Sequence, residues 1–246
     1  MSVKPNSMNG AIAFLDVLGW KGIWMRRPDP IGDLRAVIAD AQKTALTVEK
    51  RTDREAWQAM EGLKCEVVAI SDTLVLSVAG DVEPAVGYAA VVCARILASA
   101  LEKGLPMRGA IGYGSYTLDG TILVGAGVDE VAAWYETTEW IGVHLTPSAF
   151  FRLNPDTFRG LQKFTYHQYS IPMKSGKPIE SMAVAWPRAW RFDLEQEPGK
   201  RRAALMERFL AQGPLLPEVA TKLMNTIKFY DEVIKDDPRE AKERSG

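Results

Sequence analysis

The first long apolar segment of the chain, residues 10–19, reads GAIAFLDVLG and has glycine at both ends. A short continuous apolar run of this kind predicts a strand that is buried on both faces. In residues 31–50, by contrast, apolar positions recur at alternating steps of three and four. This spacing places them on one face of a helix, so we expect an amphipathic helix after the first strand.

The next apolar segments predict a hairpin followed by a buried helix. Two runs rich in β-favouring residues, 67–70 and 74–78, flank the tripeptide SDT at 71–73, so we expect a hairpin with an acidic tip. Residues 84–103 carry Ala, Val, Leu and Ile on nearly every face, which is typical of a helix that protein covers on several sides. Gly104 is suited to the C-terminal cap of this helix.

A second hairpin follows, whose turn is the dipeptide Asp119-Gly120. Its first arm contains Gly109, Gly112 and Gly114, which predict the close approach of another backbone or of a ligand. The later elements that we expect are a helix over 128–136, a strand over 140–145, a short helix opened by Thr146 and Pro147, strands within 164–174 and 181–187, and helices over 205–210 and 219–234.

The order of these elements is β-α-β-β-α-β-β-α-β, followed by a C-terminal region of mixed structure. This order predicts the α+β class, with helices packed on one face of a largely antiparallel sheet. The length of 246 residues lies between that of one large domain and that of two small ones.

Composition excludes several classes of protein. Thirty Lys and Arg residues nearly balance 31 Asp and Glu residues, so the chain has no basic field for a polyanion and we expect no nucleic-acid partner. Two cysteines, Cys65 and Cys93, and two histidines, His144 and His167, are too few for a disulfide scaffold or a zinc site. The polar amino terminus lacks a signal peptide and Arg95 interrupts the longest apolar stretch, so we expect a cytoplasmic protein without a membrane partner.

Two aspartates lie within apolar runs, where an ionised carboxylate is costly unless a positive charge or hydrogen bonds meet it. Asp16 lies within AIAFLDVLGW and Asp72 within VVAISDTLVLSV. Each could simply cap a turn by accepting backbone amides. Together they favour one shared cation, because Mg²⁺ and Mn²⁺ take carboxylate oxygens and complete their coordination with water and phosphates. Residues 17–22 include two glycines, so their amides could also cradle a triphosphate.

These segments resemble the motifs of the class III nucleotidyl cyclases. FLDVLGW resembles their first metal-binding segment, ISDT the second, and RGAIGYG and VGAGVDEVAAWYE the third and fourth core segments in order and spacing. The short chain, the Ser before the second Asp and the VDEVAAWYE segment are most similar to the pyrimidine cyclases of the Pycsar anti-phage system. The resemblance implies a ferredoxin-like βαββαβ core, with a catalytic core over residues 1–150 and a C-terminal α/β extension of the same domain over 151–246, helical at its end.

The resemblance also implies a site with two divalent ions, Mn²⁺ or Mg²⁺. Asp16 and Asp72 would bind the ions, with the carbonyl of Val17 as a further ligand. The nucleotide would contact the segment around Asp16, namely Phe14, Val17, Leu18, Gly19, Trp20 and Lys21. Within this segment, the loop 18–21 would hold the β- and γ-phosphates. The ions would lower the pKa of the ribose 3′-hydroxyl and align it for attack on the α-phosphorus, which releases pyrophosphate.

The sequence departs from the purine cyclases of this superfamily at both positions that read the base. Val68 stands four residues before the second metal-binding Asp, where purine cyclases have Lys or Glu. Ile122 stands where they have Asp or Cys. Two aliphatic side chains cannot form hydrogen bonds with adenine or guanine, which argues against both purine substrates.

Asp129 and Ala133 align with the catalytic Asn and Arg of purine cyclases. Neither can replace Arg beside a pentavalent phosphate, so the positive charge must come from the metals or from another basic group. Arg108 and Lys21 are candidates, and Arg108 shares a strand face with small residues on which a ligand can lie. Arg108 could equally pair with a surface carboxylate. Arg51 and Arg54 lie in the charged segment 50–62 and are better explained as solvated surface residues.

Aromatic residues near the predicted strand ends allow two interpretations. Trp20, Tyr113 and Tyr116 could stack on a pyrimidine, although aromatic residues at such positions usually pack against the protein. His144 lies in the apolar run WIGVHL, so we expect a core histidine rather than a catalyst.

The function that the resemblance implies is conversion of UTP into 3′,5′-cyclic UMP by a homodimer whose two chains each supply part of a site. The product would signal to a separate effector protein during phage infection. CTP is the alternative pyrimidine substrate. A purine cyclase with other base contacts and an inactive cyclase-like module that binds nucleotide are the remaining alternatives.

Overall fold

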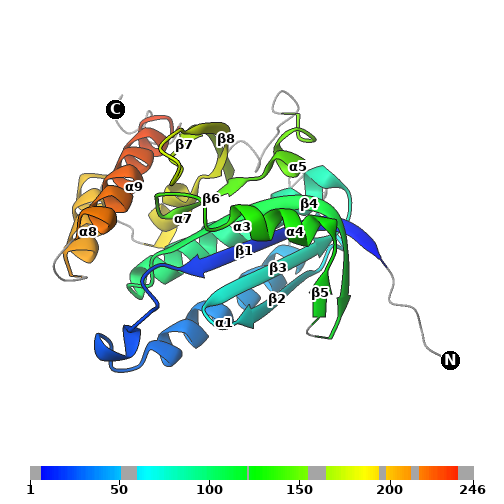
Figure 1. The fold of residues 1–246 in the computed structure, drawn as a ribbon, viewed down its shortest axis with the longest axis horizontal. Helices are drawn as coiled ribbons and strands as arrows, with labels where there is room; N and C mark the ends of the chain where they lie inside the picture. Colours follow the sequence, from blue (N-terminus) through cyan, green and yellow to red (C-terminus); the bar gives the residue numbers. More distant parts are fainter. Residues whose placement is uncertain are drawn as a thin grey trace.

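The computed structural model describes residues 7–50, 60–120, 122–154, 165–193, 198–211 and 216–237. Its centre is an eight-stranded sheet in the order β2-β3-β1-β4-β6-β8-β7, with β5 paired to β4 (Figure 1). The strands are β1 (Met8–Val17), β2 (Cys65–Ile70), β3 (Thr73–Ala79), β4 (Met107–Asp119), β5 (Ile122–Val124), β6 (Gly142–Leu145), β7 (Tyr166–Ile171) and β8 (Ile179–Val184). Neighbouring strands are antiparallel except β4 and β6, which are parallel. The predicted α+β class with a largely antiparallel sheet is confirmed.

The first six major elements form the predicted βαββαβ unit. They run β1, α1 (Pro30–Lys50), β2, β3, α3 (Val82–Glu102) and β4. Their strands lie in the order β2-β3-β1-β4, so β1 is central and pairs with β3 on one side and β4 on the other. The predicted ferredoxin-like core is therefore present.

Helix α3 forms the middle of the main core. It is buried over most of its length because Ala and Val dominate its faces, and it packs between the sheet and α1. Tyr88 of α3 donates a hydrogen bond to the carbonyl of Ala45 in α1 at 2.7 Å. Of the helices that the structure describes, α3 alone is long and apolar enough to cross a membrane by length and composition, and 78% of its most apolar window is buried inside the protein.

Helix α4 (Ala126–Trp134) corrects one expectation, because it packs on the other face of the sheet. Alternate residues of β1 divide between the two faces: Ala13 and Leu15 join the core beneath α1 and α3, whereas Ile12 contacts Val128 and Val131 of α4. Figure 1 shows α4 in front of the sheet and α3 behind it. The helices therefore do not all lie on one face.

Gly114 explains how α4 can approach β4 so closely. A Cβ atom on Gly114 would lie 2.9 Å from the Cα of Gly127, in the first turn of α4. No side chain fits at this distance, so the expected close approach of another backbone is confirmed at Gly114.

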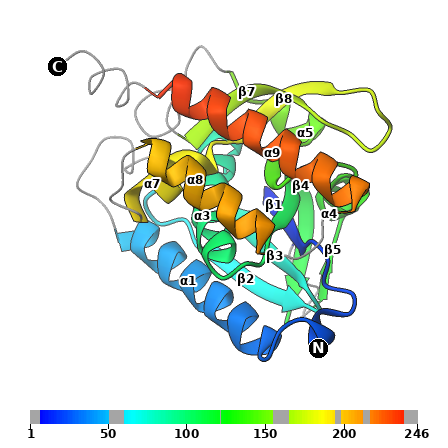
Figure 2. The same cartoon turned by 90° about the vertical axis from the view of Figure 1, so that its left-hand side faces the viewer.

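The C-terminal region adds β7 and β8 to the same sheet and covers its end with helices (Figure 2). These are α5 (Pro147–Phe150), α7 (Trp186–Asp193), α8 (Pro198–Leu210) and α9 (Pro217–Lys235). Trp140 is fully buried between Tyr169 and Phe229. Residues 186 and 187 were expected in a strand but begin α7, because Pro is well tolerated in the first turn of a helix. The limit of a catalytic core at residue 150 stays a prediction.

Candidate functional site

Asp16 lies at the end of β1, on the face of the sheet opposite to α1 and α3. Because side chains alternate along a strand, Leu15 enters the main core and Asp16 shares the other face with Phe14. Asp16 pairs with Thr73 of β3 and with Arg108 of β4. Its side chain is 15% exposed. The register of the central strand thus places one carboxylate between two neighbouring strand ends.

Asp72 lies in the two-residue turn between β2 and β3, so the predicted hairpin with an acidic tip is confirmed. The preceding residue, Ser71, has a φ of 59°, which costs a residue other than glycine about 1 kcal/mol or more. Its hydroxyl donates to Oδ1 of Asp72 at 3.0 Å. The amide of Val17 donates to the carbonyl of Asp72 at 3.3 Å. This turn therefore holds the second aspartate beside the end of β1.

Arg108 lies between two carboxylates at the start of β4. Its Nη2 is 3.6 Å from Oδ2 of Asp16 and 4.0 Å from Oε2 of Glu136. Its Nη1 donates to the carbonyl of Thr138 at 3.3 Å, and its side chain is only 8% exposed. The guanidinium group therefore connects Asp16 with the loop between α4 and β6.

Burial is the largest influence on the ionisation of Asp16 in this cluster, and the attraction of Arg108 is the next. Burial raises the pKa of Asp16 to about 6; Arg108 opposes this shift, whereas the carboxylates of Asp72 and Glu136 add to it. Burial, together with Glu136, also raises the pKa of Tyr135 to about 12. Arg108 pairs with Asp16 and Glu136, and Asp72 acts on Asp16, so three carboxylates outnumber one guanidinium group in this cluster.

This excess of negative charge and the all-oxygen donor set fit a hard divalent ion such as Mg²⁺ or Mn²⁺. The donors are the carboxylates of Asp16 and Asp72, with the carbonyl of Val17 next to the first of them. Within the described ranges, no group of three or more His, Cys, Asp or Glu residues has the arrangement of a metal site. Two aspartates would therefore leave most coordination positions to water and to a phosphate-bearing ligand.

The loop that follows β1 is only partly available to phosphate groups. Gly19 and Gly22 both have a φ of 73°, which allows the chain to turn sharply there. The amide of Leu18, however, donates to the carbonyl of Pro106 at 2.8 Å. The expected cradle of amides therefore does not include Leu18, because a backbone carbonyl already satisfies its donor.

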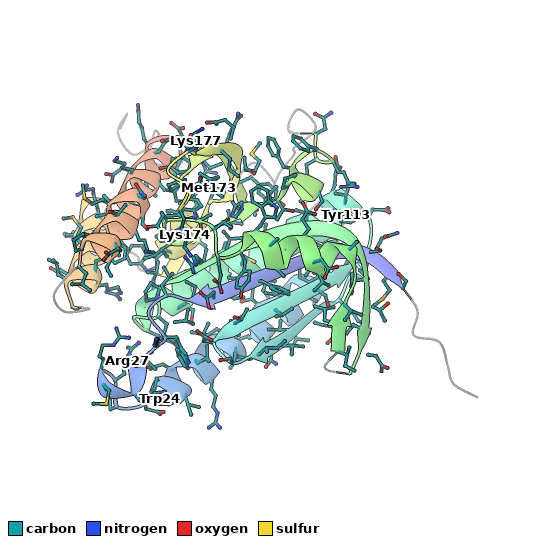
Figure 3. The ribbon with its side chains drawn as sticks, in the orientation of Figure 1. Trp24, Arg27, Tyr113, Met173, Lys174 and Lys177 are labelled. Carbon is teal, nitrogen blue, oxygen red and sulfur yellow. The ribbon has the colours of Figure 1, made fainter. Side chains whose placement is uncertain are left out.

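The loop after β1 continues into the short 3₁₀ helix η1 (Ile23–Met25), and arginine side chains form hydrogen bonds with its backbone and with residues beyond α3. Arg26 donates to the carbonyls of Gly19 and Lys21. Arg27 donates to the carbonyl of Gly104, just beyond α3, at 3.0 Å. Lys21 is exposed, and Trp20 packs edge-on against Trp24 with ring centroids 6.0 Å apart. Figure 3 shows Trp24 and Arg27 below the end of β1.

The other two predicted contact residues differ in what they present to the site. Phe14 is half-buried, and its ring packs edge-on against Tyr135 with centroids 5.5 Å apart. The side chain of Val17 is buried in the core, so only its backbone can contribute. Phe14 is thus a neighbour of the cluster, and Val17 offers a carbonyl rather than a side chain.

None of the four residues at which the sequence departs from purine cyclases has a positively charged side chain. Val68 is half-buried on the same face of the sheet as Phe14, and Ile122 is 62% exposed on β5. Asp129 and Ala133 are both exposed on α4. None of these side chains can replace a catalytic arginine.

The aromatic residues and His144 mainly pack. His144 is fully buried and its Nδ1 lies 3.1 Å from the carbonyl of Gly109, so the expected core histidine is confirmed. Burial lowers the pKa of His144 to about 4. Tyr113 donates its hydroxyl to the carbonyl of Gly80, and Tyr116 is buried beneath α4.

Two cysteines and two arginines remain among the residues that the sequence singles out. Cys93 is fully buried, whereas Cys65 is half-buried, and both are free thiols. Arg51 and Arg54 lie outside the described residues.

Three residues of this region were not expected from the sequence: Glu136, Thr138 and Lys174. Glu136 lies in the segment VDEVAAWYE, but nothing in its spacing indicates a neighbour of Asp16. Thr138 contributes a backbone carbonyl, which no sequence pattern reveals. Lys174 lies in the turn between β7 and β8, and its amide donates to the carbonyl of Thr137 at 2.8 Å. Only the tertiary structure brings that turn to the α4–β6 loop.

No family model and no curated protein matches the sequence. Similar solved structures include the catalytic core of a rhodopsin-guanylyl cyclase with converted specificity in complex with ATPαS, at 15% identity and a TM-score of 0.44 over 74% of this chain and 98% of that chain. A bacterial light-regulated adenylyl cyclase is 13% identical, with a TM-score of 0.42 over 75% of this chain and 54% of that chain. An adenylate/guanylate cyclase/hydrolase from Silicibacter pomeroyi is 13% identical, with a TM-score of 0.47 over 73% and 97%. Likenesses at this level do not decide an activity, so the function has to be argued from the residues of the site.

Proposed function

We propose that this protein is a nucleotidyl cyclase that converts UTP into 3′,5′-cyclic UMP and pyrophosphate. The observation that carries the proposal is the cluster at the end of β1. Two aspartates from adjacent strand ends and one buried arginine meet at the end of the central strand β1. Such a combination of acidic oxygens and a guanidinium group is suited to a metal-bound triphosphate.

In this proposal Asp16 and Asp72 hold two divalent ions, Mn²⁺ or Mg²⁺, with the carbonyl of Val17. When bound, these ions would neutralise the triphosphate and favour loss of the proton of the ribose 3′-hydroxyl. Arg108 would donate hydrogen bonds to a phosphate oxygen, since its planar group presents several N–H donors. Lys21, exposed in the loop after β1, would bind the outer phosphates.

The choice of a pyrimidine rests on the aliphatic side chains of Val68 and Ile122. Neither side chain can form a hydrogen bond with a purine edge. The two positions at which purine cyclases read the base therefore offer adenine and guanine no polar contact. UTP is the first substrate in this proposal, and CTP is the second.

The resemblance to the Pycsar cyclases supports the remaining parts of the proposal. The enzyme would act in the cytoplasm as a homodimer, and cyclic UMP would act on a separate effector during phage infection. Light scattering coupled to gel filtration would test the dimer independently of the activity.

The test is incubation of the purified chain with each of the four nucleoside triphosphates and Mn²⁺, with the products separated by chromatography. Cyclic UMP as the main product is the expected result. Cyclic CMP would move the assignment to the second pyrimidine. Cyclic AMP as the sole product, or no cyclic product at all, would refute the proposal and favour a purine cyclase or an inactive nucleotide-binding module.

Two substitutions connect the activity with the cluster. Asp16→Ala and Asp72→Ala should each abolish turnover while leaving a folded protein, because each removes carboxylate donors of the site. Asp119→Ala, at the opposite end of β4, is the matched control and should retain full activity. Substantial turnover by either site variant would contradict the two-metal assignment.

A further inference from the structure

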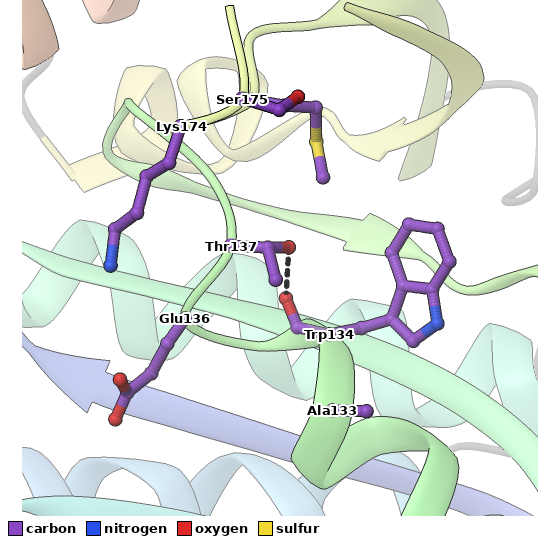
Figure 4. A pocket seen from close by; sticks show the side chains of 7 residues that line it. Ala133, Trp134, Glu136, Thr137, Lys174 and Ser175 are labelled. Atoms are coloured by element: carbon purple, nitrogen blue, oxygen red, sulfur yellow. Dashed lines mark hydrogen bonds between the residues drawn. The ribbon is translucent and has the colours of Figure 1, made fainter.

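A pocket of about 560 Å³ opens between the α4–β6 loop and the β7–β8 turn. Figure 4 shows the side chains that line it: Ala133, Trp134, Glu136, Thr137, Met173, Lys174 and Ser175. Its volume is in the range of small-molecule sites. The pocket shares Glu136 with the acidic cluster, so it continues the site described above.

Backbone contacts hold the two walls of this pocket together. The amide of Lys174 donates to the carbonyl of Thr137 at 2.8 Å, and the amide of Glu139 donates to the carbonyl of Pro172 at 2.8 Å. Thr138 and Met173 form a β-bridge between these two contacts. These backbone hydrogen bonds hold the β7–β8 turn against the α4–β6 loop, so the pocket is formed before a ligand binds.

The lining combines an apolar surface with one basic and one acidic side chain. Trp134 and Ala133 supply apolar surface, and in Figure 4 Lys174 descends from the turn on the side where the Glu136 carboxylate lies. Within the described part of the chain, the ammonium group of Lys174 forms no hydrogen bond or ion pair. A planar heterocycle that carries a carbonyl oxygen next to an N–H group matches this arrangement.

The pocket adjoins the acidic cluster through Glu136. Arg108 is 3.6 Å from Asp16 on one side and 4.0 Å from Glu136 on the other. Glu136 both lines the pocket and lies beside Arg108, so a nucleotide whose phosphates lie at Asp16 and Arg108 would have the pocket next to it on the Glu136 side. No other base-reading group is offered at Val68 or Ile122, whose side chains are aliphatic.

We propose that this pocket is the nucleobase subsite and that Lys174 and Glu136 read the edge of uracil. This inference rests on the proposed cyclase function and adds its specificity-determining residues. Lys174 donates to a carbonyl oxygen, and Glu136 accepts the hydrogen of N3. Uracil presents N3–H between two carbonyl groups, so a carbonyl oxygen lies beside N3–H in either direction. N3 of cytosine carries no hydrogen, so Glu136 could accept only from its exocyclic amino group while Lys174 donates to N3.

The test uses the full chain and two ligands, measured by isothermal titration calorimetry. The compound α,β-methylene-UTP keeps the base and three phosphorus atoms but cannot be cyclised, whereas inorganic triphosphate lacks a base. Lys174→Met should weaken binding of the UTP analogue about tenfold, the loss of one hydrogen bond from a charged donor, and leave inorganic triphosphate unchanged. Lys177→Met is the matched control, because Lys177 lies in the same turn but outside the pocket lining (Figure 3). It should change neither affinity.

Turnover provides a second measurement. The kcat/KM for UTP should fall about tenfold in the Lys174→Met variant and stay constant in the Lys177→Met variant. Equal weakening of the UTP analogue and of inorganic triphosphate would make Lys174 a phosphate ligand and overturn the proposal, as would unchanged binding of the analogue. If the unaltered chain forms cyclic UMP from UTP, either of these binding results refutes the base subsite but not the cyclase function. If the unaltered chain forms no cyclic UMP, the cyclase function and the subsite are both refuted.

Discussion

Replacing Asp16 with Asn should stabilise the protein when no metal is present. Burial holds the pKa of Asp16 at about 6, above its ordinary value of 3.8, so the folded state resists ionisation of this carboxyl group. A difference of this size corresponds to at most about 3 kcal/mol at neutral pH. The side chain keeps 15% of its exposure, so solvent screening reduces the expected gain to about 1 to 2 kcal/mol.

The sign of the effect follows from proton linkage. A carboxyl group whose pKa is raised on folding destabilises the folded state as it ionises, so the penalty grows as the pH rises from about 4 to about 6 and is complete above that range. The Asp16→Asn variant should therefore exceed the unaltered protein in stability at about pH 7.5, and by much less at about pH 4.

Urea unfolding at both pH values, with a chelator present, measures this difference. Asp119→Asn is the matched control, because it removes the same charge from an exposed residue at the far end of β4. Addition of Mn²⁺ should then stabilise the unaltered protein but not the Asp16→Asn variant, because only the former keeps both carboxylates. A variant that is less stable at about pH 7.5, or a control that gains equally, would refute the reasoning.

Three further results are expected. Gly114→Ala should lower the free energy of unfolding by about 1 to 3 kcal/mol in urea titration, since the new Cβ would lie 2.9 Å from the Cα of Gly127; an unchanged midpoint would mean that α4 does not pack there. Tyr88→Phe should cost about 1 kcal/mol in the same assay, because it leaves the buried carbonyl of Ala45 without its 2.7 Å hydrogen bond; no loss would indicate that water replaces the hydroxyl. Removal of divalent ions with a chelator should abolish cyclisation and their return should restore it; activity that persists without them would contradict the assignment of the two aspartates.

Local patterns of the sequence predict several parts of the fold. The run before Gly19, the spacing of apolar residues in 31–50 and the apolar helix 84–103 predict the first strand and two main helices within a few residues. These patterns suffice because burial repeats with the period of the element itself. Asp16 and Asp72 stand out for the same reason, since each interrupts an apolar run in which a charge is costly.

Contacts between distant segments could not be predicted in this way. The sequence contains no signal that α4 crosses to the other face of the sheet, that β6 runs parallel to β4, or that Glu136 reaches Arg108. The turn carrying Lys174 lies 158 residues after Asp16 in the chain, yet its wall of the pocket is fastened to the loop beside Arg108. Hydrophobic period and chain spacing determined which residues form strands and helices and which two carboxylates require a partner. The packing of elements across the sheet decided what surrounds those carboxylates, because side chains from separate segments meet only after the whole core has assembled.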